Sequence, residues 1–150
     1  MTNEKEAMSN KHRPTRTEFV KYYPITTRWM DNDVFGHVNN VQYYSYYDTV
    51  INRFLLEESD VNFLTGDIAA FIVHSQCFYH QSFAYPDNIE GAVKINKIGN
   101  SSVEYGVAIF LPGTNECAAH GTMTHVFVNK STQKPIPIPD SLRQVFSHFQ

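Results

Sequence analysis

The chain has 150 residues, of which 42% are apolar and 18% are charged, as in an ordinary single globular domain. This composition excludes the collagen-like, disordered and disulfide-rich classes. With 12 Lys and Arg residues against 15 Asp and Glu residues, the formal net charge is only −3. Such a chain has no basic field that would draw it to nucleic acid or anionic lipid, so we expect no nucleic-acid partner.

The first 17 residues carry charges and show no apolar periodicity, so we predict a flexible N-terminal tail at 1–17 and one domain at 18–150. The tail lacks the apolar segment of a secretory signal, which predicts a cytoplasmic location. The longest aliphatic run, Ile68–Val73, is far shorter than the roughly 20 residues that span a bilayer, so no membrane passage is expected. Cys77 and Cys117 are predicted to be reduced, packed thiols.

Residues 19–30 are rich in aromatic and β-branched side chains and predict a first strand, which ends in a loop at 31–36. A helix is predicted from Asn39 or Asn40 to Glu58, because Asn is a favourable N-cap and no Gly or Pro interrupts the segment. The apolar residues of its first half occupy most of the helix circumference. We therefore expect the rest of the fold to wrap around this helix.

Four β-rich runs follow at 69–83, 89–98, 102–111 and 117–129, separated by short turns. Short connections favour antiparallel neighbours in a meander. A Pro-rich segment then leads to Asp140 or Ser141, either of which could cap a short final helix that runs to Phe149. This order indicates an α+β domain in which one sheet curls around one helix, and its unpaired sheet edges predict at least a homodimer.

The densest polar cluster lies at 28–40, between the first strand and the long helix. A carboxylate near the start of a helix lies close to backbone N–H groups that lack intrahelical partners and to the positive end of the helix dipole. If a substrate carbonyl docked there, Asp33 could attack it or activate water, while an N–H near Asn40 stabilised the developing oxyanion. Gly36 would allow the positive φ or the close approach that this turn needs.

Other chemistries find less support in the sequence. The Asp31-x-Asp33 spacing resembles the start of a calcium loop, but Phe35 and Gln42 stand where oxygen donors are needed. No HExxH motif or Cys/His spacing joins the histidines, so no metal site is predicted and the histidines are interpreted as packed or solvated. The serines lack a Gly-x-Ser-x-Gly elbow, and no glycine-rich phosphate loop is present.

The segment 27–48, TRWMDNDVFGHVNNVQYYSYYD, resembles the signature of the hotdog-fold acyl-CoA thioesterases, specifically the 4-hydroxybenzoyl-CoA thioesterase-like family. That signature consists of an Asp, a Gly three residues later and a tyrosine-rich helix. The similarity extends over about residues 19–146 and includes the Tyr85–Asp87 turn, the Ile98–Ser102 turn, the Ala118–Val128 strand and the Pro-rich exit Pro135–Pro139.

The resemblance implies the hotdog fold, an antiparallel sheet of five or six strands around one long central helix, with homodimers that assemble into a homotetramer. It implies that Asp33 is the catalytic carboxylate, as nucleophile or general base, and that the backbone N–H of Asn40 polarises the thioester carbonyl. An acyl-CoA substrate and no cofactor are expected. Active sites of this fold form between protomers, so the expected substrate contacts come from both copies: Gly36, His37, Val38, Asn39 and Tyr43 of one, and His74 and Ser75 of the other.

Two alternatives to hydrolysis stay open. A hotdog-fold dehydratase acting on hydroxyacyl thioesters would need a catalytic histidine, for which His37 lies in the right loop, and a non-enzymatic module would bind acyl thioesters without turnover. The acyl group and the choice between CoA and acyl carrier protein also stay open. Four cations are candidates for binding the CoA phosphates: Lys94, Lys97, Lys130 and Arg143.

Overall fold

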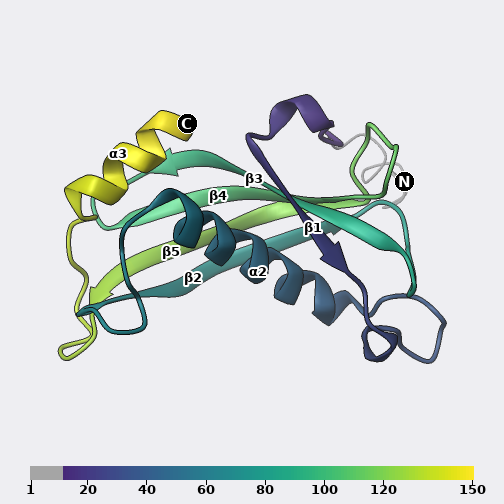
Figure 1. The fold of residues 1–150 in the computed structure, drawn as a ribbon, viewed down its shortest axis with the longest axis horizontal. Coiled ribbons are helices and arrows are strands. Elements are labelled where there is room, and N and C mark those ends of the chain that lie inside the picture. Colours follow the sequence, from purple (N-terminus) through teal and green to yellow (C-terminus); the bar gives the residue numbers. More distant parts are fainter. Residues whose placement is uncertain (1–11) are drawn as a thin grey trace, which may run out of the picture.

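A computed structural model describes residues 12–150, which form a five-stranded antiparallel sheet with one long helix against it (Figure 1). The strand order is β1-β3-β4-β5-β2. The sheet thus has five strands, as predicted. The strands are β1 (Lys21–Thr26), β2 (Ile68–Tyr79), β3 (Asn88–Ile98), β4 (Ser102–Phe110) and β5 (Ala119–Asn129).

The long helix α2 (Asn40–Glu58) begins and ends where the sequence predicts. The Asn39 side chain accepts a hydrogen bond from the Val41 N–H, which satisfies one of the donors that a helix start leaves unpaired. At the other end the Ser59 N–H and hydroxyl both donate to the Leu55 carbonyl. The buried residues recur every three or four positions, so α2 buries one stripe and not its whole circumference: Tyr43, Tyr46, Tyr47, Val50, Ile51, Phe54 and Leu55.

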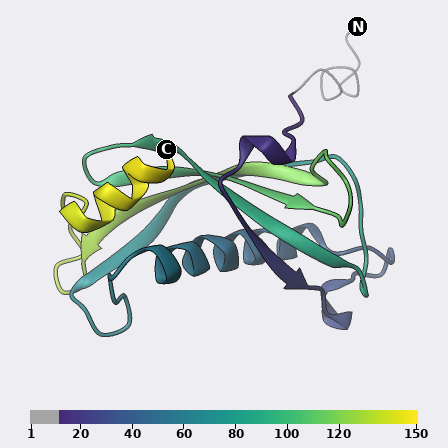
Figure 2. The ribbon, with the colours of Figure 1, turned by 45° about the horizontal axis from the view of Figure 1, so that its top comes forward.

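The two faces of the sheet carry separate apolar clusters. Along β4, Val107 and Ile109 belong to the main core with α2, whereas Ala108 and Phe110 belong to a smaller cluster on the opposite face. This alternation follows from the period of two in a strand. Figure 2 shows α2 on one side of the sheet and the short N-terminal 3-10 helix η1 (Arg16–Glu18) on the other.

The N-terminal segment covers the smaller cluster on the outer face, the face away from α2. The Arg16 guanidinium donates to the Thr114 carbonyl and to the Leu111 carbonyl, and it lies 4.8 Å from the centre of the Phe110 ring. Thr15 forms a bridge with Glu116. The packed domain therefore begins before residue 18, which corrects the predicted boundary of the tail; residues 1–11 of that tail lie outside the described residues.

The pairing of β2 differs from the predicted meander. β2 pairs with β5 along its whole length, and β3 pairs with β1 and β4. The run predicted at 69–83 ends as a strand at Tyr79, and residues 80–87 form a link to β3. The link is held by contacts with the segment before α2, since the Phe83 carbonyl accepts from the Val38 N–H and the Tyr85 N–H donates to the Asn32 side chain. These contacts carry the chain away from β2 and across the end of the sheet.

The first strand is also shorter than predicted. Residues 19–30 contain β1 at Lys21–Thr26, and a second 3-10 helix, η2 (Trp29–Asp31), occupies their end. Here the local hydrogen bonds of Asp31 turn the chain out of the strand.

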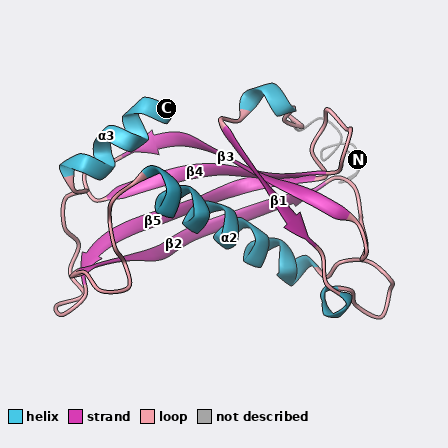
Figure 3. Ribbon diagram, viewed as in Figure 1, coloured by secondary structure: helices cyan, strands magenta, loops and turns pink. Residues whose placement is uncertain are grey.

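The final helix α3 (Asp140–Phe149, Figure 3) lies where the sequence predicts. Its N-cap residue is Pro139, which has no capping side chain, so the predicted cap at Asp140 or Ser141 is wrong. Leu142 and Phe146 are buried in the main core, and the Phe149 ring lies 5.4 Å from that of Phe54 on α2. Within residues 12–150, every helix is too short or too polar to pass through a lipid bilayer.

Candidate active site

The segment before α2 is anchored by the buried carboxylate of Asp31, which is 1% exposed. One oxygen accepts from the Tyr46 hydroxyl at 2.7 Å and from the Arg28 N–H at 2.9 Å, and the other accepts from the Arg28 guanidinium at 2.9 and 3.1 Å. Burial by itself raises the pKa of this carboxyl, but the hydrogen bonds from Tyr46 and Arg28 outweigh it and leave the pKa lowered. Asp31 is therefore a charged structural anchor.

Asp33 lies in a tight loop that folds back toward the helix start. Asn32 and Val38 form an antiparallel bridge, and the Asp33 N–H donates to the His37 carbonyl at 3.0 Å. Gly36 adopts a φ of +83°, the conformation that was predicted to need glycine there. The loop thus places the half-buried Asp33 at the N-terminal end of α2.

The Asp33 carboxylate is oriented by its own loop. One oxygen accepts from the Phe35 N–H at 2.8 Å, in an Asx turn, and the Asp33 carbonyl accepts from the Gly36 N–H. The other carboxylate oxygen has no hydrogen-bond partner among residues 12–150, so it is available to a substrate or a water molecule.

The start of α2 leaves one N–H unused. The Asn39 N–H donates to the Asp31 carbonyl, and the Val41 N–H donates to the Asn39 side chain. The N–H of Asn40, the first residue of the helix, has no acceptor within the described part of the chain. Such a group at the positive end of the helix dipole can stabilise an oxyanion.

Two of the predicted contact residues have structural roles. Val38 is 5% exposed and its N–H already donates to the Phe83 carbonyl. Tyr43 is 4% exposed, and its ring packs against those of Tyr79 and Phe83, at 4.9 and 5.2 Å. Both residues are thus packed in the core, where they support the loop that carries Asp33. The tyrosine-rich pattern identified a packed helix face, and Tyr43 does not open onto the surface beside Asp33.

An open surface pocket of about 530 Å³ lies beside Asp33. Apolar side chains around it are unusually exposed, with Val34 at 95%, Phe35 at 83% and Trp29 at 78%. Exposed apolar side chains grouped in this way mark a binding surface. The pocket is lined by Trp29, Met30, Asn32, Asp33, Val34 and Gly36.

His74 and Ser75 lie on β2, away from this loop in the sheet order. Their side chains are exposed, and no hydrogen bond or ion pair joins either to Asp33 within residues 12–150. β2 is an edge strand whose outer side is unpaired in the single chain. Neither residue lines the pocket beside Asp33.

The four cations proposed for the CoA phosphates have different environments. Lys130 donates to the Phe63 carbonyl, Arg143 donates to the carbonyls of Gly99 and Asn100, and Lys94 lies over the Phe19 ring at 5.2 Å. Lys97 is exposed.

The structure also brings together two groups that sequence reasoning missed. A cavity of about 300 Å³ between α2 and β2 is lined in part by Asp48, Asn52 and the buried His125, whose pKa burial lowers to about 4. The spacing of four between Asp48 and Asn52 signals one helix face, but nothing in the sequence places His125 opposite them. The second group consists of His80, Cys117 and His120 on the outer face.

Comparisons with known proteins agree with this architecture. Residues 27–146 match the model of the Thioesterase-like superfamily. The PA5185 protein of Pseudomonas aeruginosa is 40% identical, with a TM-score of 0.90 over 93% of this chain and 97% of that chain. Among curated proteins, none matches the chain significantly.

More distant structures share the fold. A 1,4-dihydroxy-2-naphthoyl-CoA thioesterase from Synechocystis is 19% identical, with a TM-score of 0.76 over 84% of this chain and 94% of that one. A DHNA-CoA thioesterase from Staphylococcus aureus is 16% identical, with a TM-score of 0.77 over 85% and 88%.

The fold and the family match together define a hotdog-fold thioester hydrolase. The chain belongs to the Thioesterase-like superfamily, as the match over residues 27–146 shows.

The Asp31 anchor yields a prediction about stability. Replacing Tyr46 by Phe removes a buried hydrogen bond to a charged group, and we expect a loss of about 1.5–3 kcal/mol of unfolding free energy at pH 7. Because the folded-state pKa of Asp31 is lowered, this stabilisation is present above the unfolded pKa of about 3.9 and is lost as the pH falls through the folded value. Urea unfolding at pH 7 and pH 3 should show the penalty shrinking at pH 3.

The control for this prediction is Tyr44→Phe, at a half-buried tyrosine on the same helix that makes no contact with Asp31. It should unfold like the wild type at both pH values. An equal penalty for Tyr46→Phe at pH 7 and pH 3 would contradict the charged state assigned to Asp31.

Proposed function

We propose that the protein hydrolyses an acyl-CoA thioester to the free carboxylic acid and CoA, with Asp33 as the nucleophile or the general base. The observation that carries this proposal is the closed loop at 32–38, which holds a carboxylate with one free oxygen at the end of α2 where the Asn40 N–H is unpaired. Thioester hydrolysis needs these two functions, attack on the carbonyl carbon and stabilisation of the oxyanion.

Both routes use the same two groups. In the general-base route, Asp33 takes a proton from water as the water oxygen adds to the carbonyl carbon, and the C–S bond then breaks to release the CoA thiolate. In the nucleophilic route, the Asp33 carboxylate adds to the carbonyl carbon, CoA leaves, and water hydrolyses the resulting anhydride. In either route the negative charge forms on the carbonyl oxygen, where the Asn40 N–H and the helix dipole stabilise it.

The surroundings of Asp33 favour an apolar acyl group. Trp29, Val34 and Phe35 present large exposed apolar surfaces beside the pocket, and an acyl chain or ring would cover them. CoA thioesters are also the substrates named for two structures with the same fold. A carrier other than CoA would present the same thioester group, so only turnover of acyl-CoA itself would support CoA as the carrier.

The unpaired edge of β2 supports a homodimer in which β2 strands of two copies pair and extend the sheet. Phe71, Ile72 and Val73 are 44%, 40% and 60% exposed on this edge strand, a combination that soluble chains normally cover. Pairing of the edges would bring His74 and Ser75 of one copy toward the active-site loop of the other. Association of two such dimers would give the homotetramer.

Turnover should depend on Asp33. We expect purified wild-type protein to release thiol from at least one member of a panel of acyl-CoAs, from short chains to aromatic groups, and Asp33→Asn to lower kcat at least 10²-fold. Asp60→Asn, at an exposed acid beyond α2, is the matched control and should keep wild-type kcat.

The same assay separates the alternative functions. Loss of activity in His37→Ala together with full activity in Asp33→Asn would assign the reaction to the histidine and favour a dehydratase. Tight binding of acyl-CoA without turnover on any member of the panel would favour a binding module.

The Asn40 N–H can be removed without breaking the helix. Proline is well tolerated at the first helical position, and Asn39, with φ −62° and ψ 140°, already has the extended conformation that a residue before proline requires. Asn40→Pro should therefore lower kcat by about 10²–10³-fold at unchanged stability, whereas Asn40→Ala should stay within a few-fold of wild type. Equal activity of the two variants would show that this N–H does not stabilise the transition state.

The dimer yields a separate prediction. Introducing charge on the β2 edge with Phe71→Lys and Val73→Lys together should convert the dimer to a monomer at micromolar concentration, because twofold pairing brings like charges together. Leu64→Lys, at an 89% exposed position outside the sheet, is the control. Analytical ultracentrifugation measures the result, and a monomeric wild type would contradict the proposed assembly.

A further inference from the structure

Three potential metal ligands from distant parts of the sequence meet on the outer face of the sheet. His80 directly follows β2, Cys117 precedes β5 by two residues, and His120 is the second residue of β5. One ligand atom of each lies within 4.8 Å of the others. Among residues 12–150 they are the only group of three or more such side chains that is close enough to hold an ion.

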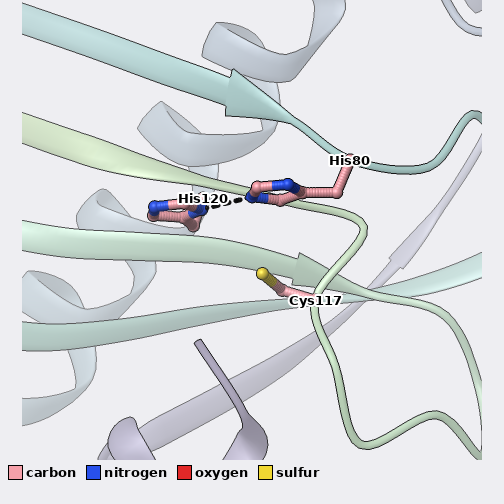
Figure 4. A group of neighbouring side chains, drawn as sticks. All are labelled: His80, Cys117 and His120. Atoms are coloured by element: carbon pink, nitrogen blue, oxygen red, sulfur yellow. Dashed lines mark hydrogen bonds between the residues drawn. The ribbon is translucent and has the colours of Figure 1, made fainter. Parts of the chain in front are cut away.

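The backbone fixes the positions of these side chains. His120 pairs with Phe78 in the β2–β5 ladder, and the N–H groups of His80 and Gln81 both donate to the Ala118 carbonyl, at 2.9 and 3.0 Å. The end of β2 is thus clamped to the start of β5. Figure 4 shows the two imidazoles end to end, with the Cys117 sulfur on the side toward them.

We propose that His80, Cys117 and His120 form a binding site for one zinc ion. A thiolate and two imidazoles are a donor set that zinc prefers, and the Cys-x-x-His spacing of Cys117 and His120 lets both reach one ion. In a tetrahedral zinc site the donor atoms are about 3.3–3.7 Å apart, as follows from Zn–N near 2.0–2.1 Å and Zn–S near 2.3 Å. The present His80 Nε2 to His120 Nδ1 separation is 2.8 Å, so the two rings must turn and move these nitrogens apart by about 0.5 Å to hold an ion.

Each proton on the three ligand side chains can be accounted for when zinc binds. One N–H lies between His80 Nε2 and His120 Nδ1 in the hydrogen bond. On binding, that proton moves to the far nitrogen of the same ring, both near nitrogens bond to the ion, and the Cys117 thiol loses its proton to solvent. The fourth position of the ion is left to a water molecule.

The positive charge nearest the site is already compensated. The Arg13 guanidinium donates to the Cys117 carbonyl at 2.8 Å and forms an ion pair with Glu116 at 3.1 Å. Arg13 is therefore held on the backbone side of Cys117 by an acceptor and an acidic partner.

The site would act as a clasp at one end of the sheet. It joins the end of β2 to the chain segment that enters β5. His80 is the first residue of the link at 80–87, which contains Phe83. Because the Phe83 carbonyl accepts from the Val38 N–H in the active-site segment, tightening this link would steady the loop that holds Asp33. The ion's role is structural, and no ligand comes from the loop at 32–38.

The experiment uses the full chain with any affinity tag removed and with metal stripped by a chelator. Isothermal titration with zinc chloride should give one zinc per chain, and titration with cobalt chloride should give both a thiolate-to-cobalt charge-transfer band and the visible bands of tetrahedral cobalt. His80→Asn, His120→Asn and Cys117→Ser should each weaken zinc binding at least 10-fold, and Cys117→Ser should abolish the charge-transfer band. The matched controls, His74→Asn and Cys77→Ser, should bind zinc like the wild type.

Several outcomes would overturn the site. These are no zinc binding by the wild type at micromolar concentration, cobalt bands without the thiolate band, or an equal loss of binding in the control variants. Cys117 is fully buried, and replacing it also disturbs the apolar packing on the outer face, so His80→Asn, at a half-buried position, provides an independent test. Zinc should raise the thermal unfolding midpoint of the wild type and leave that of His80→Asn unchanged.

Discussion

The buried carboxylate of Asp31 is the constraint on which the candidate active site depends. It accepts from Tyr46 on α2 and from both the backbone and the guanidinium of Arg28, so one side chain fastens the segment before the helix to the helix itself. A buried charge is tolerated only when its hydrogen bonds are complete, so the loss of any one of these bonds would destabilise the whole arrangement. The Asp31 carbonyl, through the Asn39 N–H, then sets the residue that caps α2.

That anchor allows the loop it supports to be exposed. Val34 and Phe35 project into solvent and Asp33 keeps a free carboxylate oxygen, yet the loop has a defined shape because both of its ends are bonded to buried groups. The single chain therefore leaves apolar surface open in two places, beside Asp33 and along the β2 edge. A substrate covering the first and a second copy covering the second would bury both.

Local sequence signals predicted the helices and strands better than they predicted which strands pair. The Asn39 cap and the uninterrupted segment to Glu58 define α2, and the short turns of β3, β4 and β5 define their antiparallel order. The β2–β5 pairing joins Ile68 to Asn129, and no local pattern encodes a contact over such a separation. The same pairing brings His80 to His120, so the metal-ligand cluster could not be found by motif spacing. Asp33 and Asn40 could be proposed as site residues from the sequence because both lie within one contiguous segment. The position of Tyr43 indicated a helix face, but the sequence does not show which way that face points.

The link at 80–87 connects the two faces of the sheet in a way that their separate cores do not. It begins at His80 on the outer face, and it reaches the active-site segment through the Phe83 carbonyl and the Tyr85 N–H, with the Tyr85 and Trp29 rings 6.0 Å apart. The hydrogen bonds at Phe83 and Tyr85 thus connect the segment that starts at His80 to the loop that carries Asp33.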